Sequence, residues 1–430
     1  MKWVLEELIA GLDARVVAGD PRTAVEGAAV DSRQQLAGRL FVGLAGEHHD
    51  GGIHAPDALA GGAAAALVGP SVWPQIRERI AAEGGTVVVA PEPLAVLQAA
   101  GRRALERSGA TVVAITGSVG KTTTKDILVA MLRAAGVQVH GTAGNRNTEV
   151  GVPLSMLDLP DDAAVAVVEM GMRGPGQIAE LVGLAPPHVA CITAIAPVHL
   201  ELLESVEQIA AAKAEIFCRL GAGDIAVVPA DEPLLAPHLA ALPDAVEIRS
   251  FDGLPDDVGI SLQKAWQQRN AAAAWACCMA LGLCPPAGVR IEVDLSTMRG
   301  QERPLAGGGT LIEDCYNANP VAMGAALRDL ALRDGRRVAV LGDMMELGPD
   351  EAHFHREVGE LVAELGIDFL VAVGPRAADY VAGAAGVPSV QFADAAAAAR
   401  GVPGVLRDGD TVLVKASRSV ALERVCEVLT

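Results

Sequence analysis

The sequence predicts an α/β protein of three domains that is built on parallel sheets. The chain has 430 residues, a length that suits about three domains of ordinary size. Short apolar segments alternate with helical segments in two long blocks, which is typical of repeated βαβ units. Hydrophobic residues make up 51% of the chain and aromatic residues only 3%, so we expect aliphatic, alanine-rich cores.

The first block, residues 1–84, carries short strand signals and ends in an Ala/Gly-rich helix, so we expect a small N-terminal α/β domain. Its first residues, Met1–Glu7, are typical of an amphipathic helix with early acidic residues and not of a signal peptide. The alanine-rich run at 61–67 predicts either a helix or a buried strand.

The second block, residues 85–300, predicts a central parallel sheet, because apolar strand-like segments alternate there with helical ones. Its strands are expected at 111–116, 164–170, 188–196 and 224–230. The third block, residues 301–430, repeats the pattern and predicts a C-terminal Rossmann-like domain with a doubly wound sheet. Its strands are expected at 311–312, 337–341, 369–373 and 411–414.

A glycine-rich turn joins the first strand of the second block to a helix expected at Thr124–Ala135. Such a turn directs backbone N–H groups and the positive end of a helix dipole at one point, where a phosphate is stabilised. A lysine in the turn can contact the β- and γ-phosphates, and the next threonine hydroxyl can bind Mg²⁺. The spacing departs from the standard P-loop, because Ile115 occupies the position of its first glycine. The turn consists of Gly117, Ser118, Val119, Gly120, Lys121, Thr122 and Thr123.

This turn predicts a P-loop ATPase-like central domain that binds ATP. The alternative is an ordinary strand–turn–helix in which Gly-Lys-Thr occurs by chance.

The charge of the chain limits its partners. The formal net charge of −19 argues against a nucleic-acid partner, which needs a basic face. No apolar run reaches the roughly 18 residues of a membrane span, so we expect no integral membrane contact. Seven cysteines without metal-binding spacing suit reduced thiols in a cytoplasm.

Polar residues that follow the predicted strands of the second block form another candidate site. Glu169 ends one strand and His199 follows another, at the sheet edge where open α/β sheets bind ligands. Lys213 lies in a predicted helix. Taken singly, these residues are equally consistent with a solvated acid, a capped histidine and a surface lysine. Together, a carboxylate and an imidazole beyond an ATP loop predict a Mg²⁺ site.

Several segments, in this order along the chain, resemble those of the Mur ligases, the ATP-dependent amide-bond ligases of peptidoglycan synthesis. They are Gly117–Thr123, Gly144–Leu154, Glu169–Gly171, His199–Glu201 and Ala212–Ile216. Asp314–Pro320 and Leu341–Gly348 are similar to the member that adds D-alanyl-D-alanine to UDP-N-acetylmuramoyl-tripeptide. The Asp-Asn-Pro-Arg signature of the sibling that adds the third amino acid is absent.

The resemblance implies an enzyme that joins D-alanyl-D-alanine to UDP-N-acetylmuramoyl-tripeptide through an acyl phosphate, with ATP and Mg²⁺. It also implies a monomer in the bacterial cytoplasm, with uridine diphosphate bound by the first domain, ATP by the second, and the third closing over both.

The resemblance further implies roles for single residues. Lys121, Glu169, His199, Lys213 and Arg299 are expected to be catalytic. Thr122, Glu169, His199 and Lys213, the last as a CO₂-derived carbamate, are expected to bind the metal. The nucleotide is expected to contact the glycine-rich turn together with Asn270, Asp314, Tyr316, Asn317 and Pro320. The UDP-linked substrate is expected to contact Ser32, Arg33, Asn145 and Asn147, and the amine substrate the Lys415–Arg418 segment.

The sequence departs from the family pattern before Asn270, and two other functions are alternatives to a ligase. The stretch from Ser250 to Asn270 is short, and Trp266–Arg269 replaces the usual lead-in to the adenine-side asparagine. A P-loop kinase would use ATP without needing an amine. A non-catalytic nucleotide-sugar-binding regulator would be expected to lose Lys121, Glu169 or Lys213, and all three are present.

Overall fold

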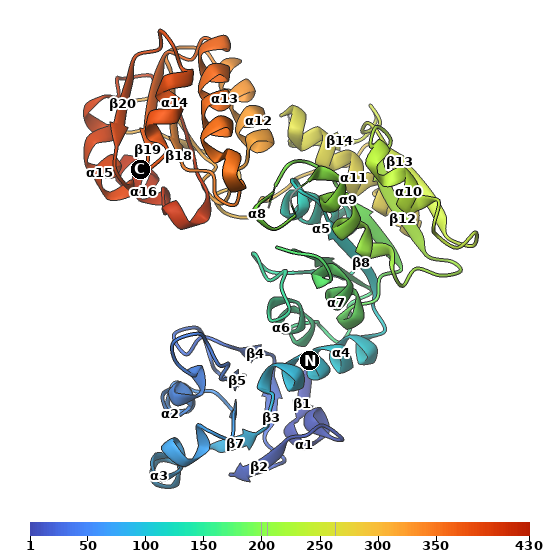
Figure 1. Cartoon of the computed structure of the whole chain (residues 1–430). Helices are drawn as coiled ribbons and strands as arrows, with labels where there is room; N and C mark the ends of the chain where they lie inside the picture. Colours follow the sequence, from blue (N-terminus) through green and yellow to red (C-terminus); the bar gives the residue numbers. More distant parts are fainter. Residues whose placement is uncertain (199, 204, 263) are drawn as a thin grey trace.

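A computed structural model of the chain has three lobes that follow one another along the sequence (Figure 1). It describes residues 1–198, 200–203, 205–262 and 264–430. Within these residues each lobe is built on one main sheet, with five strands in the first lobe and six in each of the others. Among the described residues, no helix is long and apolar enough to cross a membrane.

The N-terminal lobe holds a mainly parallel sheet whose strand order is β2-β7-β6-β5-β4. Only β2 runs antiparallel to its neighbour. The strands are β2 (Arg15–Ala18), β4 (Ala28–Ala29), β5 (Leu40–Val42), β6 (Ala65–Val68) and β7 (Thr86–Val89). The helices of this lobe are α1 (Leu5–Ile9), α2 (Ala55–Ala60) and α3 (Trp73–Glu83).

The predicted N-terminal helix and the predicted domain boundary both need correction, and the alanine-rich run leads into a strand and not into a helix. Residues Lys2–Val4 form strand β1, which pairs with β3 (Ala24–Glu26), so the expected N-terminal helix begins only at Leu5. Pairing with a distant strand overrides the local helical pattern there. Strand β7 lies inside the first sheet, so this sheet extends past the expected boundary at residue 84 to Val89. The alanine-rich run leads into the fully buried strand β6.

The middle lobe holds a parallel sheet with the order β13-β12-β11-β8-β10-β9. Its strands are β8 (Thr111–Thr116), β9 (Val139–Gly141), β10 (Val165–Glu169), β11 (Val189–Ile192), β12 (Ile225–Pro229) and β13 (Glu247–Phe251). The longer helices are α4 (Pro93–Ser108), α5 (Lys121–Ala134), α6 (Gly151–Leu157), α7 (Gln177–Leu184), α9 (Val206–Ala214) and α11 (Ala265–Leu281). Short helices α8 (Leu200–Leu203) and α10 (Ala236–Leu239) and the strand pair β14 (Gly259–Ile260) and β15 (Arg290–Ile291) complete it.

The predicted strands of the middle lobe are confirmed, with one correction. Strand β11 ends at Ile192, whereas the apolar segment continues to residue 196. The Thr193 N–H still donates to the Thr116 carbonyl of β8 at 2.9 Å, but beyond it the backbone bonds to the glycine-rich turn: the Ala194 carbonyl accepts from the Ser118 N–H at 2.8 Å.

The C-terminal lobe holds a sheet with the order β16-β17-β21-β18-β19-β20, in which only β16 is antiparallel to its neighbour. Its strands are β16 (Gln301–Pro304), β17 (Thr310–Glu313), β18 (Arg337–Gly342), β19 (Phe369–Val373), β20 (Ser389–Phe392) and β21 (Thr411–Lys415). Its helices are α12 (Pro320–Ala331), α13 (Glu351–Glu364), α14 (Ala377–Gly383), α15 (Ala395–Gly401) and α16 (Glu423–Leu429). Separate aliphatic cores cover the two faces of the sheet, as the predicted doubly wound fold requires.

The first two lobes share one hydrophobic core, which includes Leu5 from the first and Leu97 and Met156 from the second. A polar contact reinforces this junction. The Asp158 carboxylate accepts from Arg39 of the first lobe and from Arg146 of the second, each at 2.7 Å. Because Arg146 lies between Asn145 and Asn147, this junction supports the loop that bears both asparagines.

Candidate active site

A cavity of about 990 Å³ lies between the middle and C-terminal lobes. The glycine-rich turn and the segment after β11 form its middle-lobe wall, and loops after β17, β18 and β21 form the opposite wall. The predicted site residues that line it are Ser118, Val119, Gly120, Lys121, Thr122, Thr123, Asn145, Asn147, Glu169, Asn270, Arg299, Asp314, Tyr316, Asn317, Lys415, Ser417 and Arg418. Among the described residues, the lining does not include Gly117, Lys213, Pro320, Ser32 or Arg33.

The glycine-rich turn has the predicted strand–turn–helix geometry. It follows β8, and α5 begins at Lys121, earlier than the expected start at Thr124. Gly117 has φ +149°, and a Cβ there would lie 2.0 Å from Thr193 Oγ1. Gly120 has φ +87° and precedes the first residue of α5. Both positions therefore require glycine, and the N-terminus of α5 opens into the cavity.

The turn is fastened to the segment that follows β11. The Ser118 hydroxyl donates to the Ala196 carbonyl at 3.0 Å, and the Thr193 hydroxyl donates to the Val119 carbonyl at 2.6 Å. These bonds fix the shape of the turn before any phosphate binds. The sequence analysis missed Thr193, although its place just beyond a parallel strand is where ligand-site residues of such sheets lie.

Cationic groups gather around the turn. Lys121 Nζ donates to the Gly117 carbonyl at 2.6 Å. Burial lowers the pKa of Lys121, the nearby Glu169 carboxylate partly offsets this shift, and the Arg299 cation adds to it. Burial, together with the charge of Lys121, also holds the pKa of Lys213 well below its ordinary value. A group of cations around one carboxylate suits a polyanionic ligand.

Arg299 reaches the turn from the start of the C-terminal lobe. Its Nη2 donates to the Thr122 hydroxyl at 3.2 Å. Its guanidinium carbon lies 3.8 Å from the centroid of the Tyr316 ring, close enough for a cation–π contact. Lys121 and Arg299 therefore present two positive charges from two lobes to the same end of the cavity.

Glu169 is the last residue of β10, as predicted, and is buried. One carboxylate oxygen, Oε1, accepts from Asn147 Nδ2 at 2.7 Å. The other oxygen, Oε2, is buried and has no hydrogen-bond partner among the residues that the structure describes. The Glu169 carboxylate and the Thr122 hydroxyl line the same cavity and are the hard oxygen ligands that Mg²⁺ prefers, so these residues fit the expected metal. The predicted ligand His199 lies outside the described residues.

The remaining predicted nucleotide-site residues lie along both walls. Asn270 of α11 packs against Gly120, where a Cβ would lie 2.2 Å from Asn270 Oδ1. The Asp314 carboxylate accepts from Lys415 Nζ at 2.7 Å. Pro320 is the first residue of α12, which Asn319 caps by accepting from the Ala322 N–H at 2.9 Å. Pro320 thus begins a helix and does not face the cavity.

The predicted uridine-diphosphate residues lie in the first lobe, away from the cavity. Arg33 is exposed and donates to both carboxylate oxygens of Asp31, at 2.9 Å and 2.8 Å. Hydrogen bonding to Arg33 lowers the pKa of Asp31 to about 2. The cavity therefore brings together most of the predicted residues of the second and third lobes that the structure describes, without Gly117, Lys213 and Pro320, and Ser32 and Arg33 lie apart from them.

A buried histidine, which sequence reasoning did not find, holds the loop after β18. His355 Nε2 accepts from the Met344 N–H at 2.9 Å, and the other ring nitrogen lies 2.6 Å from the Glu351 carbonyl. Burial lowers the pKa of His355, against the opposing charges of Asp343 and Asp379. The next residues along this loop, 345–347, line the cavity.

We expect this histidine to make stability depend on pH. Because its pKa is lowered on folding, its contribution is fully present above the ordinary histidine value, about 6.5, and is lost as the pH falls below it. His355→Leu should cost about 1–3 kcal/mol at pH 7.5, since the Met344 N–H loses its acceptor. Urea unfolding of both proteins should show this difference shrinking between pH 7.5 and 5. A difference that stays constant would contradict the assignment of a neutral ring.

Comparisons with known proteins agree with this architecture. The family model described as "Mur ligase middle domain" matches residues 115–255, and "Mur ligase, glutamate ligase domain" matches residues 298–418. The chain is 35% identical over 422 residues to the UDP-N-acetylmuramoyl-tripeptide--D-alanyl-D-alanine ligase of Synechocystis sp., with 93% of this chain and 90% of that protein covered. Identity to the Escherichia coli protein of the same name is 33% over 430 residues, with 93% and 92% covered.

Solved structures resemble the whole chain as well. A crystal structure of MurF from Acinetobacter baumannii has a TM-score of 0.83 at 27% identity and covers 100% of this chain and 99% of that one. MurF from Thermotoga maritima in complex with ADP has a TM-score of 0.76 at 28% identity, with 94% and 97% covered. Since two family models and full-length relatives match the chain, it belongs to the Mur ligase family.

Proposed function

We propose that this chain is an ATP-dependent ligase that joins D-alanyl-D-alanine to UDP-N-acetylmuramoyl-tripeptide, giving UDP-N-acetylmuramoyl-pentapeptide, ADP and phosphate. The observation that carries the proposal is that two cations, Lys121 and Arg299, both contact a preformed glycine-rich turn. Relatives that match the chain over nearly its whole length bear this ligase name. The first lobe, to Val89, binds the UDP end, and the other two enclose the reacting groups.

A carboxylate must be activated before an amine can attack it, because it lacks a good leaving group. It is a poor electrophile, because its leaving group would be oxide. In the first step the carboxylate oxygen attacks the γ-phosphorus of ATP and the bond to ADP breaks, which gives an acyl phosphate. In the second step the neutral amine of D-alanyl-D-alanine attacks the acyl carbon, and phosphate leaves with the C–O bond electrons. The amine proton passes to solvent or phosphate.

The protein's part in the first step is to position and neutralise anions. A carboxylate and a triphosphate repel each other, so cations near the transferring group lower the barrier. Lys121 contributes one charge and Arg299 another, and the backbone N–H groups of the turn supply fixed dipoles. Asn145 and Asn147 orient the substrate carboxylate beside this group. His199, Glu169 and Lys213 complete the catalytic set.

We assign the Mg²⁺ ligands to Thr122, Glu169, His199 and a carbamate on Lys213. The ion, when bound, supplies positive charge that screens the phosphate oxygens. The burial of Lys213 supports the carbamate, since a lowered pKa favours the neutral amine that adds to CO₂. The addition of CO₂ to the neutral amine forms an N–C bond and releases one proton, so a buried neutral amine becomes an anion that can pair with Lys121.

The nucleotide lies between the turn and the far wall, in contact with Asn270, Asp314, Tyr316 and Asn317. Pro320 acts indirectly by starting α12. Lys415–Arg418 lies near the amine substrate. Acyl phosphates hydrolyse, so the cavity must exclude water before transfer, and closure of the two lobes provides this. Residues of one chain form both walls, which supports a monomer. Bacterial relatives and free thiols support a place in the bacterial cytoplasm.

The UDP end gives a test of its own. Arg33→Ala should raise the KM for the UDP-linked substrate by about 10-fold or more, because a charge-assisted phosphate contact is lost. The KM for ATP should stay unchanged, since Arg33 lies outside the cavity. Steady-state kinetics with each substrate varied in turn measures both values. Equal changes in the two KM values would show that Arg33 acts through the fold and not through the substrate.

The amine that is ligated tests the function itself. Ligation of D-alanyl-D-alanine, D-alanine and meso-diaminopimelate should be measured side by side, with the products identified by mass. The dipeptide should be the preferred amine. Preference for a single amino acid would refute the choice among the Mur ligases, and a stable phosphate ester as product would favour a kinase.

A further inference from the structure

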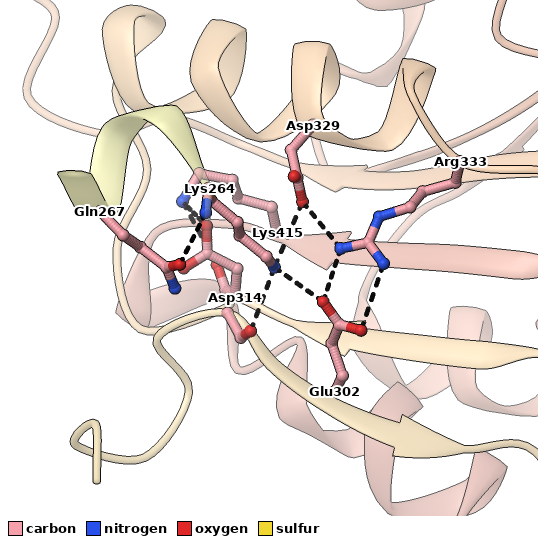
Figure 2. Close-up of polar contacts among 8 residues, drawn as sticks. Lys264, Gln267, Glu302, Asp314, Asp329, Arg333 and Lys415 are labelled. Atoms are coloured by element: carbon pink, nitrogen blue, oxygen red, sulfur yellow. Dashed lines mark hydrogen bonds and ion pairs between the residues drawn. The ribbon is translucent and has the colours of Figure 1, made fainter. Parts of the chain in front are cut away.

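A charged network joins the middle lobe to the C-terminal lobe (Figure 2). Lys264, just before α11, pairs with Glu302 of β16 at 3.1 Å and with Asp329 of α12 at 3.2 Å. Arg333 contacts the same two carboxylates, at 2.6 Å and 3.4 Å. Two cations thus meet two anions, so the network is electrically balanced.

The network is shielded at Lys264 and Asp329, whereas the side chain of Glu302 is 38% exposed and that of Arg333 is 30% exposed. The Lys264 side chain is 10% exposed and that of Asp329 is 15% exposed. Isolated exposed pairs contribute about 0–1 kcal/mol, whereas shielded charges lose water and depend on their partners. Removing the Lys264 ammonium would leave Glu302 and Asp329 with Arg333 as their remaining shared cation.

The two sides of this contact both carry residues of the proposed ATP site. On one side, α11 begins next to Lys264 and bears Asn270. On the other side, Glu302 lies three residues after Arg299, and Lys264 Nζ also donates to the Gly300 carbonyl at 3.4 Å. The ring of Trp266 packs on Gly300, where a Cβ would lie 3.3 Å from the ring.

We propose that Lys264 is a positioning residue for the phosphoryl-transfer step. Lys264 holds Arg299 against Thr122 of the glycine-rich turn. By anchoring Gly300 and Glu302 to the start of α11, it fixes the backbone on which the Arg299 side chain rests. This inference rests on the proposed function, because it gives Arg299 a role at the transferring phosphoryl group.

The side chain of Lys264 can be removed without removing the cap of α11. The cap uses the Lys264 backbone N–H, which donates to Gln267 Oε1 at 3.1 Å. A change at this side chain should therefore leave Asn270 in place and loosen only Arg299. The prediction is a loss in kcat with little change in the KM for ATP.

The test compares Lys264→Met with Lys264→Arg and with a control, Arg79→Met. Arg79 pairs with Asp57 and Glu83 on an exposed face of the first lobe. Lys264→Met should lower kcat about 10- to 100-fold, the effect of misplacing a catalytic group by about 1 Å, and change the KM for ATP less than about 3-fold. Lys264→Arg should restore most of kcat, and Arg79→Met should match wild type.

A double-mutant cycle with Arg299→Lys asks whether Lys264 acts through Arg299. In that background Lys264→Met should have little further effect on kcat, because the group that it positions is already altered. Additive losses, or a wild-type kcat in Lys264→Met, would overturn the proposal. If Lys264→Met does not fold, Glu302→Gln/Asp329→Asn removes the partners instead and must lower kcat likewise, and a wild-type kcat there would also overturn it.

Failure of the proposed function would look different. A wild-type protein that releases no phosphate in response to the dipeptide would refute the ligase. With a wild-type protein that does respond, the Lys264 series tests the inference alone.

Discussion

Lys121→Ala is expected to lower kcat by about 10²- to 10³-fold or more while the protein remains folded, because one of the charges at the transferring phosphoryl group is lost. In the structure this ammonium rests on the Gly117 carbonyl and is poised to turn toward a phosphate. Burial removes water from this ammonium and so lowers its pKa. A bound polyphosphate would supply the negative charge that stabilises the ammonium there. Single-turnover phosphoryl transfer in a rapid-quench assay measures the effect.

The control is Lys2→Ala, which removes an exposed lysine from β1. The thermal unfolding midpoints of both variants should lie within a few degrees of the wild-type value. Both variants should bind the UDP-linked substrate with wild-type affinity. Near-normal turnover of Lys121→Ala would remove the support for ATP at this turn.

Lys213→Ala is expected to be nearly inactive, and small carboxylic acids should partly restore its activity. Lys213 is 1% exposed, so truncation leaves a cavity that an acid such as acetate can enter. The acid would supply the carboxylate oxygens that the carbamate provides in the wild type. Activity of the variant should be titrated with formate, acetate and propionate, with chloride at equal ionic strength as the control.

Two results would contradict the carbamate. One is full activity of Lys213→Ala without any acid. The other is a ¹³CO₂ NMR measurement on the native, active enzyme that finds only the free amine. Either would leave Lys213 as a buried core lysine.

Much of the fold could be predicted, because the relevant signals are local. Strand β8, the glycine-rich turn and α5 each have a sequence pattern of their own, and the two positive-φ glycines are dictated by the chain's own close approaches. Lys2–Val4 was predicted wrongly, since its strand exists only through pairing with Ala24–Glu26, and local patterns do not report such partners.

The parts of the site that could not be predicted depend on contacts between distant segments. Thr193 holds the turn from the end of the neighbouring strand β11, 74 residues beyond Val119 in the chain, and Lys264 meets carboxylates from the next lobe. In the sequence, Lys264 is a single lysine before a helix, with nothing to distinguish it from a solvated one. Arg299 was predicted only through the family resemblance, yet its contact with Thr122 has a plain physical meaning once the lobes are in place.

If ATP activates a carboxylate for attack by D-alanyl-D-alanine, inorganic phosphate must be released in step with ligation. Purified protein should be supplied with ATP and Mg²⁺, and with each acceptor substrate alone and both together. We expect sustained phosphate release only when UDP-N-acetylmuramoyl-tripeptide and D-alanyl-D-alanine are both present, with one phosphate formed for each pentapeptide. Sustained release that needs no dipeptide, or no UDP-linked substrate, would contradict it.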